Sequence, residues 1–238
     1  ADAIATGHYA KTEGGHLFAA KDANKDQTYF LFATKKEELD FIRFPIGDFY
    51  KSDVRKLAEY FGLQVASKPD SQDICFVPGD YTEIINNIKP GRSHSGDIIH
   101  VDGRVIGKHS GIINFTIGQR RGIGVSTTDP LYVVKIDSQN NSVIVGPHSA
   151  LLTRSLKIKD VNLLLPSEIP PSGIEVNVKL RSSHLGSPAL ILPIDEETQT
   201  HEIILKDEHF AIAPGQACVL YQNDRLIGDQ MIGGGWIC

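Results

Sequence analysis

The spacing of apolar residues changes near residue 96, and this change constrains the fold more than any other feature of the sequence. Before it, apolar residues recur at helical spacing, and one face of a predicted helix carries Val54, Leu57, Ala58 and Phe61. Beyond it, short segments alternate apolar and polar residues, as half-buried strands do. Short strands in close succession are typical of a small closed barrel rather than of βαβ units. The sequence therefore predicts an α/β part followed by a β part.

The α/β part is expected to hold one strand end and three helices. Residues 4–6 resemble the end of a strand that leads into a turn at Gly7. The predicted helix boundaries are a capping box at Thr34 and Glu37, an N-cap at Ser52 with a stop at Gly62, and a Pro-Gly stop after residues 80–88.

The β part begins with a hairpin whose two-residue turn is Asp102-Gly103. Two more strands are predicted over residues 131–136 and 143–146. Six further strands are expected at 157–161, 175–180, 189–192, 202–205, 217–221 and 226–232. Pro and Gly residues punctuate the pattern near 85–92 and 147–155, which makes these two stretches candidate domain boundaries.

Charge is unevenly distributed along the 238 residues, which carry 24 Lys+Arg against 29 Asp+Glu. The balance is 11 − 14 = −3 over residues 1–89, 7 − 4 = +3 over 90–154 and 6 − 11 = −5 over 155–238. A basic middle is compatible with contact to a polyanion, although ordinary surface variation is the stronger interpretation of charge alone.

Two classes of protein are excluded by composition. No apolar run reaches the roughly 20 residues that a membrane helix requires, so a spanning protein is not expected. The three cysteines are too few for a disulfide framework or a four-ligand zinc site, and a reducing compartment is the default. The nine histidines show no metal-binding spacing with them, so we predict no metal site.

Cys75 is the candidate nucleophile. It follows a polar loop, residues 68–73, where hydrogen-bond donors could expose and activate a thiol. A buried structural cysteine is the alternative, and the sequence slightly favours it. Cys218 alternates with apolar residues and is predicted to lie in the core, whereas Cys238 has no expected role.

Several polar groups are candidates for ligand contact. Gly7 follows a strand, where a glycine lets the backbone approach a ligand, and His8 could then donate a hydrogen bond. Residues 25–27 combine Lys, Asp and Gln, which could position phosphate and base edges. A simple turn and an ordinary polar loop are the alternatives. Loop groups of lower specificity are Arg181, Ser182 and Gln216.

Arg120 and Arg121 are the strongest intrinsic indication of nucleic-acid binding. They lie between Gly118 and Gly122 in the basic segment. Arginine binds phosphate in a bidentate manner, and glycines let the backbone come close. A solvated hairpin tip is an equally good interpretation.

Long motifs in this sequence closely resemble those of the tRNA-specific 2-thiouridylases. They occur in family order and cover nearly the whole chain, and the resemblance weakens in the last 80 or so residues. The motifs lie at residues 5–9, 22–31, 44–47, 54–58, 70–76, 116–122 and 214–216. The resemblance implies a truncated Rossmann-like ATP-pyrophosphatase domain over 1–86, a small mixed, basic, tRNA-contacting domain over 87–150 and an antiparallel β-barrel over 151–238.

The resemblance also implies an activity. Family members replace the C2 oxygen of the wobble uridine with sulfur in tRNAs for Lys, Glu and Gln. They use ATP, with Mg²⁺, to adenylate that oxygen, and a protein persulfide supplies the sulfur. Expected partners are therefore tRNA and a persulfide donor protein in the cytoplasm, with the oligomeric state open.

Site residues carry over position by position. Cys75 matches the cysteine that carries sulfur as a persulfide, and Gly7 matches an ATP-contacting glycine. The residues that match tRNA contacts are His8, Lys25, Asp26, Gln27, Arg181 and Gln216. Ser182 stands where the family has an aromatic residue, which puts its tRNA-contacting role in doubt.

Two family features are not found in this sequence. One is the S-G-G-x-D-S loop that cradles the ATP phosphates, and the other is a second cysteine that attacks the persulfide or pairs with Cys75. The chain also starts with Ala1 inside an apolar alternation, which indicates a fragment. We therefore expect a sulfurtransferase as parent protein and a polypeptide that is inactive alone. The alternatives are a non-catalytic tRNA-binding module and, less favoured, a related ATP pyrophosphatase acting on another nucleotide.

Overall fold

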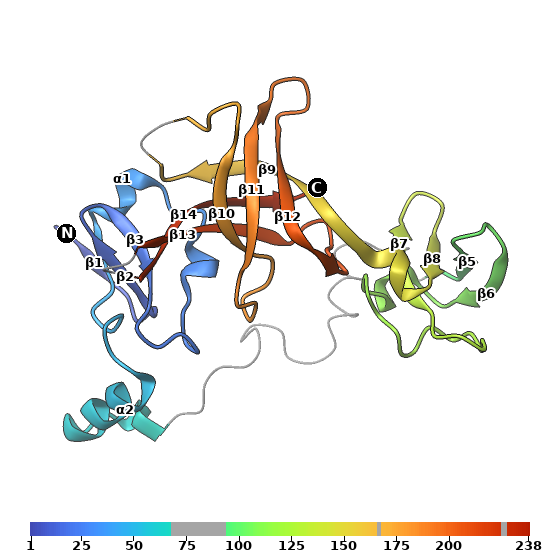
Figure 1. Cartoon of the computed structure of the whole chain (residues 1–238). Coiled ribbons are helices and arrows are strands. Elements are labelled where there is room, and N and C mark those ends of the chain that lie inside the picture. Colours follow the sequence, from blue (N-terminus) through green and yellow to red (C-terminus); the bar gives the residue numbers. More distant parts are fainter. Residues whose placement is uncertain (68–93, 166–167, 225–227) are drawn as a thin grey trace. The chain divides into compact units, whose positions relative to one another are not determined.

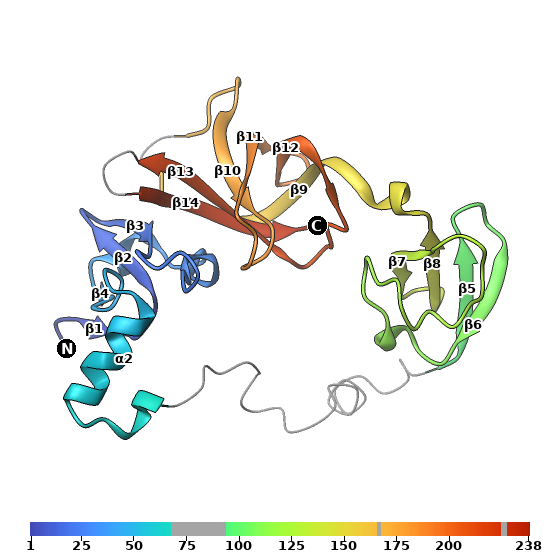
Figure 2. The same cartoon turned by 60° about the horizontal axis from the view of Figure 1, so that its bottom comes forward.

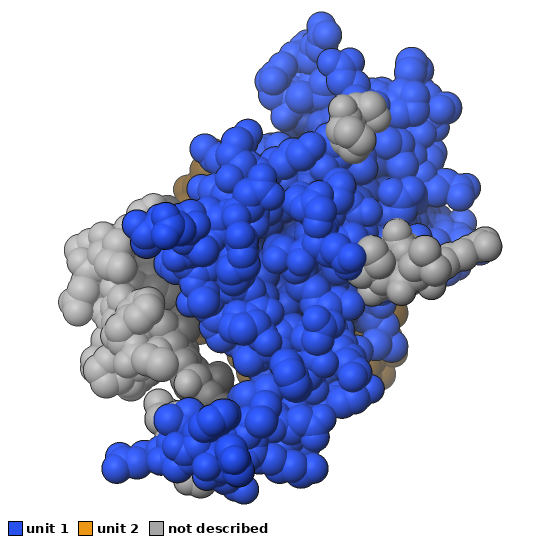
Figure 3. Space-filling view, turned by 90° about the vertical axis from the view of Figure 1, so that its left-hand side faces the viewer, with its two compact units in different colours: residues 1–69, 154–207, 214–238 blue, residues 70–153, 208–213 orange. Residues whose placement is uncertain are grey.

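The computed structural model describes residues 1–67, 94–165, 168–224 and 228–238 (Figure 1). The chain divides into two compact units, each with its own core. Unit 1 comprises residues 1–69, 154–207 and 214–238 (blue in Figure 3), and unit 2 comprises residues 70–153 and 208–213. Cys75 and the helix expected over residues 80–88 lie outside the described residues. None of the helices in the described ranges is long and apolar enough to cross a bilayer.

The first part of unit 1 has α/β character. Strand β1 (Ile4–Ala5) confirms the strand predicted at residues 4–6, and it pairs in parallel with β4 (Ile42–Arg43). A hairpin of β2 (Ala10–Glu13) and β3 (His16–Ala19) follows. The remaining elements are short: η1 (Thr28–Leu31), α1 (Lys36–Leu39), α2 (Lys51–Tyr60) and η2 (Gln64–Ser67).

Both helix starts differ from the predicted ones. At α1 the N-cap is Lys35, whose amide donates to the Glu38 carboxylate at 2.9 Å, so the capping box at Thr34 and Glu37 was wrong by one residue. At α2 the N-cap is Tyr50 rather than Ser52. The first amide of α2 donates instead to Oδ2 of Asp22 at 3.0 Å, a cap supplied by a distant loop.

The end of α2 is as predicted. Gly62 adopts φ +66°, and its amide donates to the Glu59 carbonyl at 2.9 Å. The apolar face of the helix is not covered by the described residues, because Leu57 is 43% and Phe61 68% exposed.

The second part of unit 1 is a closed antiparallel barrel, as predicted. Its strands are β9 (Leu152–Leu163), β10 (Ile174–Lys179), β11 (Ser187–Asp195), β12 (Thr200–Phe210), β13 (Ala217–Asp224) and β14 (Gly228–Ile237). They follow the order β13-β10-β11-β12-β9-β14, and β13 pairs with β14 to close the ring (Figure 2). Alternate residues fill the interior; Val178, Ile191, Ile203 and Leu220 are fully buried.

The N-terminal hairpin extends the barrel sheet. Strand β14 pairs with β3 through Met231 and Leu17, so β3 and β2 continue the sheet beyond the ring. A second apolar core then forms on the outer face of β13 and β14. Barrel residues Val219, Tyr221 and Met231 pack there with residues of the first 39, among them Leu17 and Phe32.

Unit 2 contains a four-stranded mixed sheet with the order β6-β5-β8-β7. Its strands are β5 (Gly96–His100), β6 (Val105–His109), β7 (Tyr132–Asp137) and β8 (Ser142–Gly146), with short turns η3 (Ile112–Asn114) and η4 (His148–Leu151). The hairpin predicted around Asp102-Gly103 is confirmed, but four residues, 101–104, separate its strands rather than the predicted two. The tail of β12 joins this unit, where Phe210 stacks on His148 at 4.4 Å between ring centroids.

Candidate functional site

A cleft of about 640 Å³ opens in unit 1 between two loops. One loop follows β3 and the other connects β10 to β11. We call it the loop cleft, and its lining residues are Lys11, Ala19, Ala20, Lys21, Ala23, Asn24, Asp26, Asp48, Lys179, Ser182, Ser183, His184, Leu185, Gly228 and Asp229. Three lysines and three aspartates line it, so it offers both donors and acceptors rather than a purely basic wall.

Asp26 is held in the cleft by several hydrogen bonds and an ion pair. Its side chain is only 4% exposed and forms an ion pair with Lys179 at 3.1 Å. It also accepts hydrogen bonds from the Ala20 amide at 3.1 Å and from Oγ1 of Thr28 at 2.8 and 2.9 Å. Thr28 in turn contacts the Tyr221 hydroxyl at 3.0 Å. The carboxylate therefore joins its own loop to strands β10 and β13.

Gln27 holds the segment that contains Gly7 and His8. Its side-chain Oε1 accepts from the Tyr9 amide at 2.9 Å, and its own amide donates to the Tyr9 carbonyl at 2.8 Å. The His8 ring contacts Oγ1 of Thr6 at 2.9 Å and meets Phe44 edge-on. Among the described residues, no atom would lie within 4 Å of a Cβ on Gly7, so they leave the backbone open to a ligand at this point.

Lys25 and Arg181 adjoin the cleft-lining residues Asp26 and Ser182 in sequence. Arg181 and Ser182 are exposed, and Lys25 is half-buried. Because Arg181 and Ser182 are exposed, the loop between β10 and β11 presents polar groups to solvent. The charge of Arg181 also acts on Tyr29: burial raises the pKa of that tyrosine, and the positive charge offsets part of the rise.

Gln216 lies apart from the other candidates. It precedes β13 and does not line the loop cleft. Its carbonyl accepts from the Ile237 amide at 2.8 Å, and its Oε1 is buried with no hydrogen-bond partner among the described residues.

The structure thus brings two distant groups of predicted residues to one place. Asp26 and Ser182 line the same cleft, and Gln27 connects that loop to Gly7 and His8. Sequence reasoning missed the cleft residues Lys11, Lys21 and Lys179. The only available signal for Lys179 was its place near the end of the strand predicted over 175–180, because its partner Asp26 is 153 residues away.

The two described thiols are free, and Cys218 is unsuited to nucleophilic chemistry. Cys218 is fully buried, as predicted, and burial raises the pKa of its thiol to about 12. Cys238 is exposed, and its Sγ lies 3.5 Å from the Lys157 carbonyl. Within the described ranges no three His, Cys, Asp or Glu side chains gather as a metal site would require.

Unit 2 carries a second candidate surface. Arg120 and Arg121 are exposed in the loop before β7, and they do not form a hairpin tip. The loop is anchored by buried Ile123 and by the Gln119 side chain, which accepts from the Thr116 amide at 3.0 Å and donates to the Arg121 carbonyl at 2.9 Å. These contacts fix the backbone of the loop that carries the two guanidinium groups.

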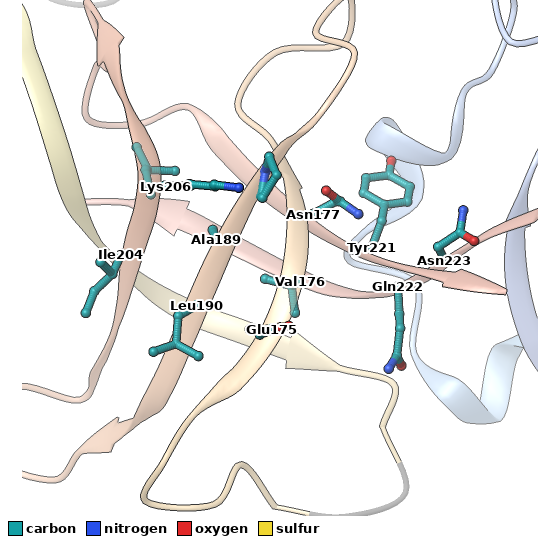
Figure 4. A pocket seen from close by; sticks show the side chains of 12 residues that line it. Glu175, Val176, Asn177, Ala189, Leu190, Ile204, Lys206, Tyr221, Gln222 and Asn223 are labelled. Carbon is teal, nitrogen blue, oxygen red and sulfur yellow. The ribbon is translucent and has the colours of Figure 1, made fainter.

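A second hollow, of about 680 Å³, lies on strands β10 to β13 (Figure 4). Its lining combines apolar side chains such as Leu190 and Ile204 with polar ones such as Asn177 and Gln222. None of the residues predicted from the sequence lines this hollow. The loop cleft is therefore the better candidate site.

Comparison with known proteins covers nearly the whole chain. Sequence models of three domains match: "tRNA methyl transferase HUP domain" over residues 1–79, "tRNA methyl transferase PRC-barrel domain" over 84–147 and "Aminomethyltransferase beta-barrel domain" over 153–237. A protein of Ehrlichia ruminantium (strain Gardel) named tRNA-specific 2-thiouridylase MnmA is 50% identical over 242 residues, which include all of this chain. The chain belongs to the tRNA-specific 2-thiouridylase family.

Other thiouridylases match equally well. Proteins with the same name from Wolbachia pipientis subsp. Culex pipiens (strain wPip) and Rickettsia canadensis (strain McKiel) are each 51% identical, over 100% and 98% of this chain. The chain spans 64% of the Ehrlichia thiouridylase and 63% of the other two. The family resemblance is confirmed, and so is the predicted combination of an α/β N-terminal domain, a central domain and a C-terminal β-barrel.

Proposed function

We propose that this chain recognises tRNA and transfers sulfur in a tRNA-uridine 2-sulfurtransferase. The proposed product is 2-thiouridine at the wobble position of tRNAs for Lys, Glu and Gln. The loop cleft carries the proposal, because it gathers loops around Asp26 and Ser182 that lie more than 150 residues apart. Polar loops around a cleft suit an RNA in which a base is turned out of its stack.

The proposed reaction has three bond exchanges. The uridine C2 oxygen attacks the α-phosphorus of ATP, accompanied by Mg²⁺, and pyrophosphate leaves. The terminal sulfur of a persulfide on Cys75 then bonds to C2, and AMP leaves with the former oxygen. A second thiol attacks Sγ of Cys75, which releases the uridine sulfur and leaves a disulfide for a reductant to reopen. A persulfide protein reloads Cys75, and we place the reaction in the cytoplasm, with tRNA.

The exposed backbone at Gly7 suits a nucleotide lying against it. Because a Cβ there would contact none of the residues that the structure describes, Gly7→Ala is expected to leave the unfolding temperature unchanged and to weaken ATP-dependent turnover in a full-length enzyme. Activity equal to that of the unsubstituted enzyme would argue against a nucleotide at Gly7. The printed sequence holds no S-G-G-x-D-S loop, so we expect the 238-residue polypeptide alone to release no pyrophosphate.

The decisive experiment uses this chain joined to the N-terminal part of an Ehrlichia thiouridylase. Cys75→Ser should abolish 2-thiouridine, measured by mass spectrometry of digested tRNA, while tRNA affinity stays unchanged. The matched control Cys238→Ser should keep full activity, because it alters a thiol outside the loop cleft. Normal thiolation by the Cys75→Ser enzyme would rule out the persulfide role.

A non-catalytic tRNA-binding module is the second candidate. The exposed Arg120 and Arg121 support it, because held guanidinium groups bind phosphate without any chemistry. Under this alternative, alkylation of Cys75 leaves thiolation by the joined enzyme unchanged.

A further inference from the structure

A buried ion pair connects the loop cleft to the barrel. The ammonium of Lys179 on β10 lies 3.1 Å from the Asp26 carboxylate, with the two side chains 16% and 4% exposed. The same ammonium lies 4.9 Å from the centre of the Tyr221 ring. Lys179 is therefore held from two sides, by a carboxylate and by an aromatic face.

The bonding of Asp26 is directed to the protein. Its oxygens accept from the Ala20 amide, from the Thr28 hydroxyl and from Lys179. A carboxylate that is 4% exposed offers almost no surface to an RNA, and its charge would repel phosphate. Direct contact with tRNA, which the resemblance implies for Asp26, is thus poorly supported by the geometry.

Burying two charges is costly, and such pairs are best attested where they fix one arrangement over others. Here the pair fixes residues 20–28 against β10. The neighbouring Lys21 is exposed and lines the cleft, and Lys25 precedes Asp26 directly. A shift of the loop would therefore displace both lysines.

We propose that Lys179 and Asp26 form a positioning pair. The pair holds residues 20–28 in the arrangement in which Lys21 and Lys25 contact the tRNA backbone. Neither Lys179 nor Asp26 contacts tRNA. The inference rests on the proposed function in one respect, namely that tRNA binds at the loop cleft. It adds Lys179 to the recognition machinery and gives Asp26 a positioning role.

The salt dependence of tRNA binding separates positioning from contact. Each phosphate contact contributes somewhat less than one unit to the slope of log K against log salt concentration, so losing a contact lowers the slope. Lys179→Met should weaken binding about tenfold between roughly 50 and 250 mM salt with an unchanged slope. Lys21→Met should reduce the slope, and Lys206→Met, on the outer face of β12, should change neither quantity.

Hydrogen exchange of backbone amides tests the positioning pair in the absence of tRNA. The amides of Ala20 and Thr28 donate to Asp26, so Lys179→Met should speed their exchange at least tenfold, while exchange in the barrel interior at Val178 stays unchanged. If Lys179→Met leaves an uncompensated buried carboxylate that unfolds the protein, the double variant Lys179→Met/Asp26→Asn removes both charges. It should fold, exchange rapidly in the loop and bind tRNA about tenfold more weakly than the unsubstituted protein, again with an unchanged salt slope.

Two results would overturn the proposal. A reduced salt slope for Lys179→Met would make Lys179 a phosphate contact, and unchanged loop exchange in both variants would mean that the pair fixes nothing. If the unsubstituted protein binds no tRNA at any salt concentration, the proposed function fails, and hydrogen exchange still decides whether the pair holds the loop.

Discussion

On strand β13, burial acts on two titratable side chains that face opposite sides of the sheet. Cys218 points into the barrel, and burial raises its pKa to about 12. Tyr221 points to the outer face, where burial raises its pKa and the negative charge of Asp26 adds to the rise. Both side chains are therefore uncharged at neutral pH, and ionising either one opposes folding.

Cys218 should resist alkylation in the folded protein. With a pKa near 12, about one thiol in ten thousand is ionised at pH 8, and the fully buried sulfur is inaccessible as well. Peptide mass spectrometry after iodoacetamide treatment should find Cys238 modified and Cys218 unmodified. Unfolding in guanidinium provides the control, in which both become modified; rapid labelling of native Cys218 would contradict its placement.

Stability should fall in alkaline solution. The pKa of Tyr221 is higher in the folded than in the unfolded protein, where it is near 10. Such a group contributes fully to the free energy of unfolding below its unfolded pKa. The contribution is lost as the pH rises through the folded pKa. The unfolding temperature should therefore decline above about pH 9 as Cys218 ionises in the unfolded chain, and more steeply above about pH 10, where Tyr221→Phe should flatten the decline. At pH 7 the same substitution should cost about 1 kcal/mol, because the Thr28 contact is lost. An unaltered alkaline profile in Tyr221→Phe would exclude Tyr221 as its source.

At the scale of elements, strand β14 runs further than its sequence indicates. The predicted strand stopped at residue 232, just before three glycines, yet β14 continues to Ile237. A Cβ on Gly234 would lie 2.9 Å from Cδ2 of Phe32 and 3.0 Å from the Cys218 carbonyl. The glycine therefore allows the N-terminal segment to pack directly on the strand.

Gly234→Ala should destabilise the protein by about 1–3 kcal/mol, because the added methyl group overpacks the contact with Phe32. Chemical denaturation should register the loss as a lower midpoint. Gln222→Ala, at an exposed position of neighbouring β13, is the matched control and should change little. Equal midpoints for the two variants would mean that the contact tolerates a methyl group.

Elements bounded by local signals could be predicted, and those bounded by distant partners could not. The Asp102-Gly103 hairpin and the stop at Gly62 depend on backbone conformations that neighbouring residues determine. The cap of α2 comes from Asp22, 29 residues away, so Ser52 was chosen wrongly. The β2–β3 hairpin was missed although Gly14 and Gly15, both with positive φ, form a recognisable two-residue turn.

At the scale of the whole molecule, unit 1 is assembled from segments that are far apart in the chain. The barrel alone would expose the outer face of β13 and β14, which residues such as Leu17 and Phe32 now cover. The site shows the same dependence, because Asp26 meets Lys179 only after the two segments pack. Sequence motifs identified Asp26 and Ser182 as candidates, and only the fold shows that they share a cleft.

A polypeptide of residues 152–238 should therefore be less stable than the complete chain. Its uncovered apolar face should bind the dye ANS, and its unfolding temperature should lie below that of the barrel in the intact protein. Adding residues 1–67 as a separate polypeptide should reverse both effects. A barrel that melts at the intact temperature without binding dye would show that the N-terminal segment contributes nothing to its stability.

The pairing of β3 with β14 has a consequence for synthesis on the ribosome. His16 contacts Gln230 at 2.9 Å across 214 residues of chain, so the first hairpin must wait for almost the entire polypeptide before its partner strand exists. Contacts this distant in sequence form late and slow folding. During that interval Leu17 and Phe32 lack the barrel residues that they pack against, and exposed apolar side chains of this kind favour aggregation of a partly folded chain.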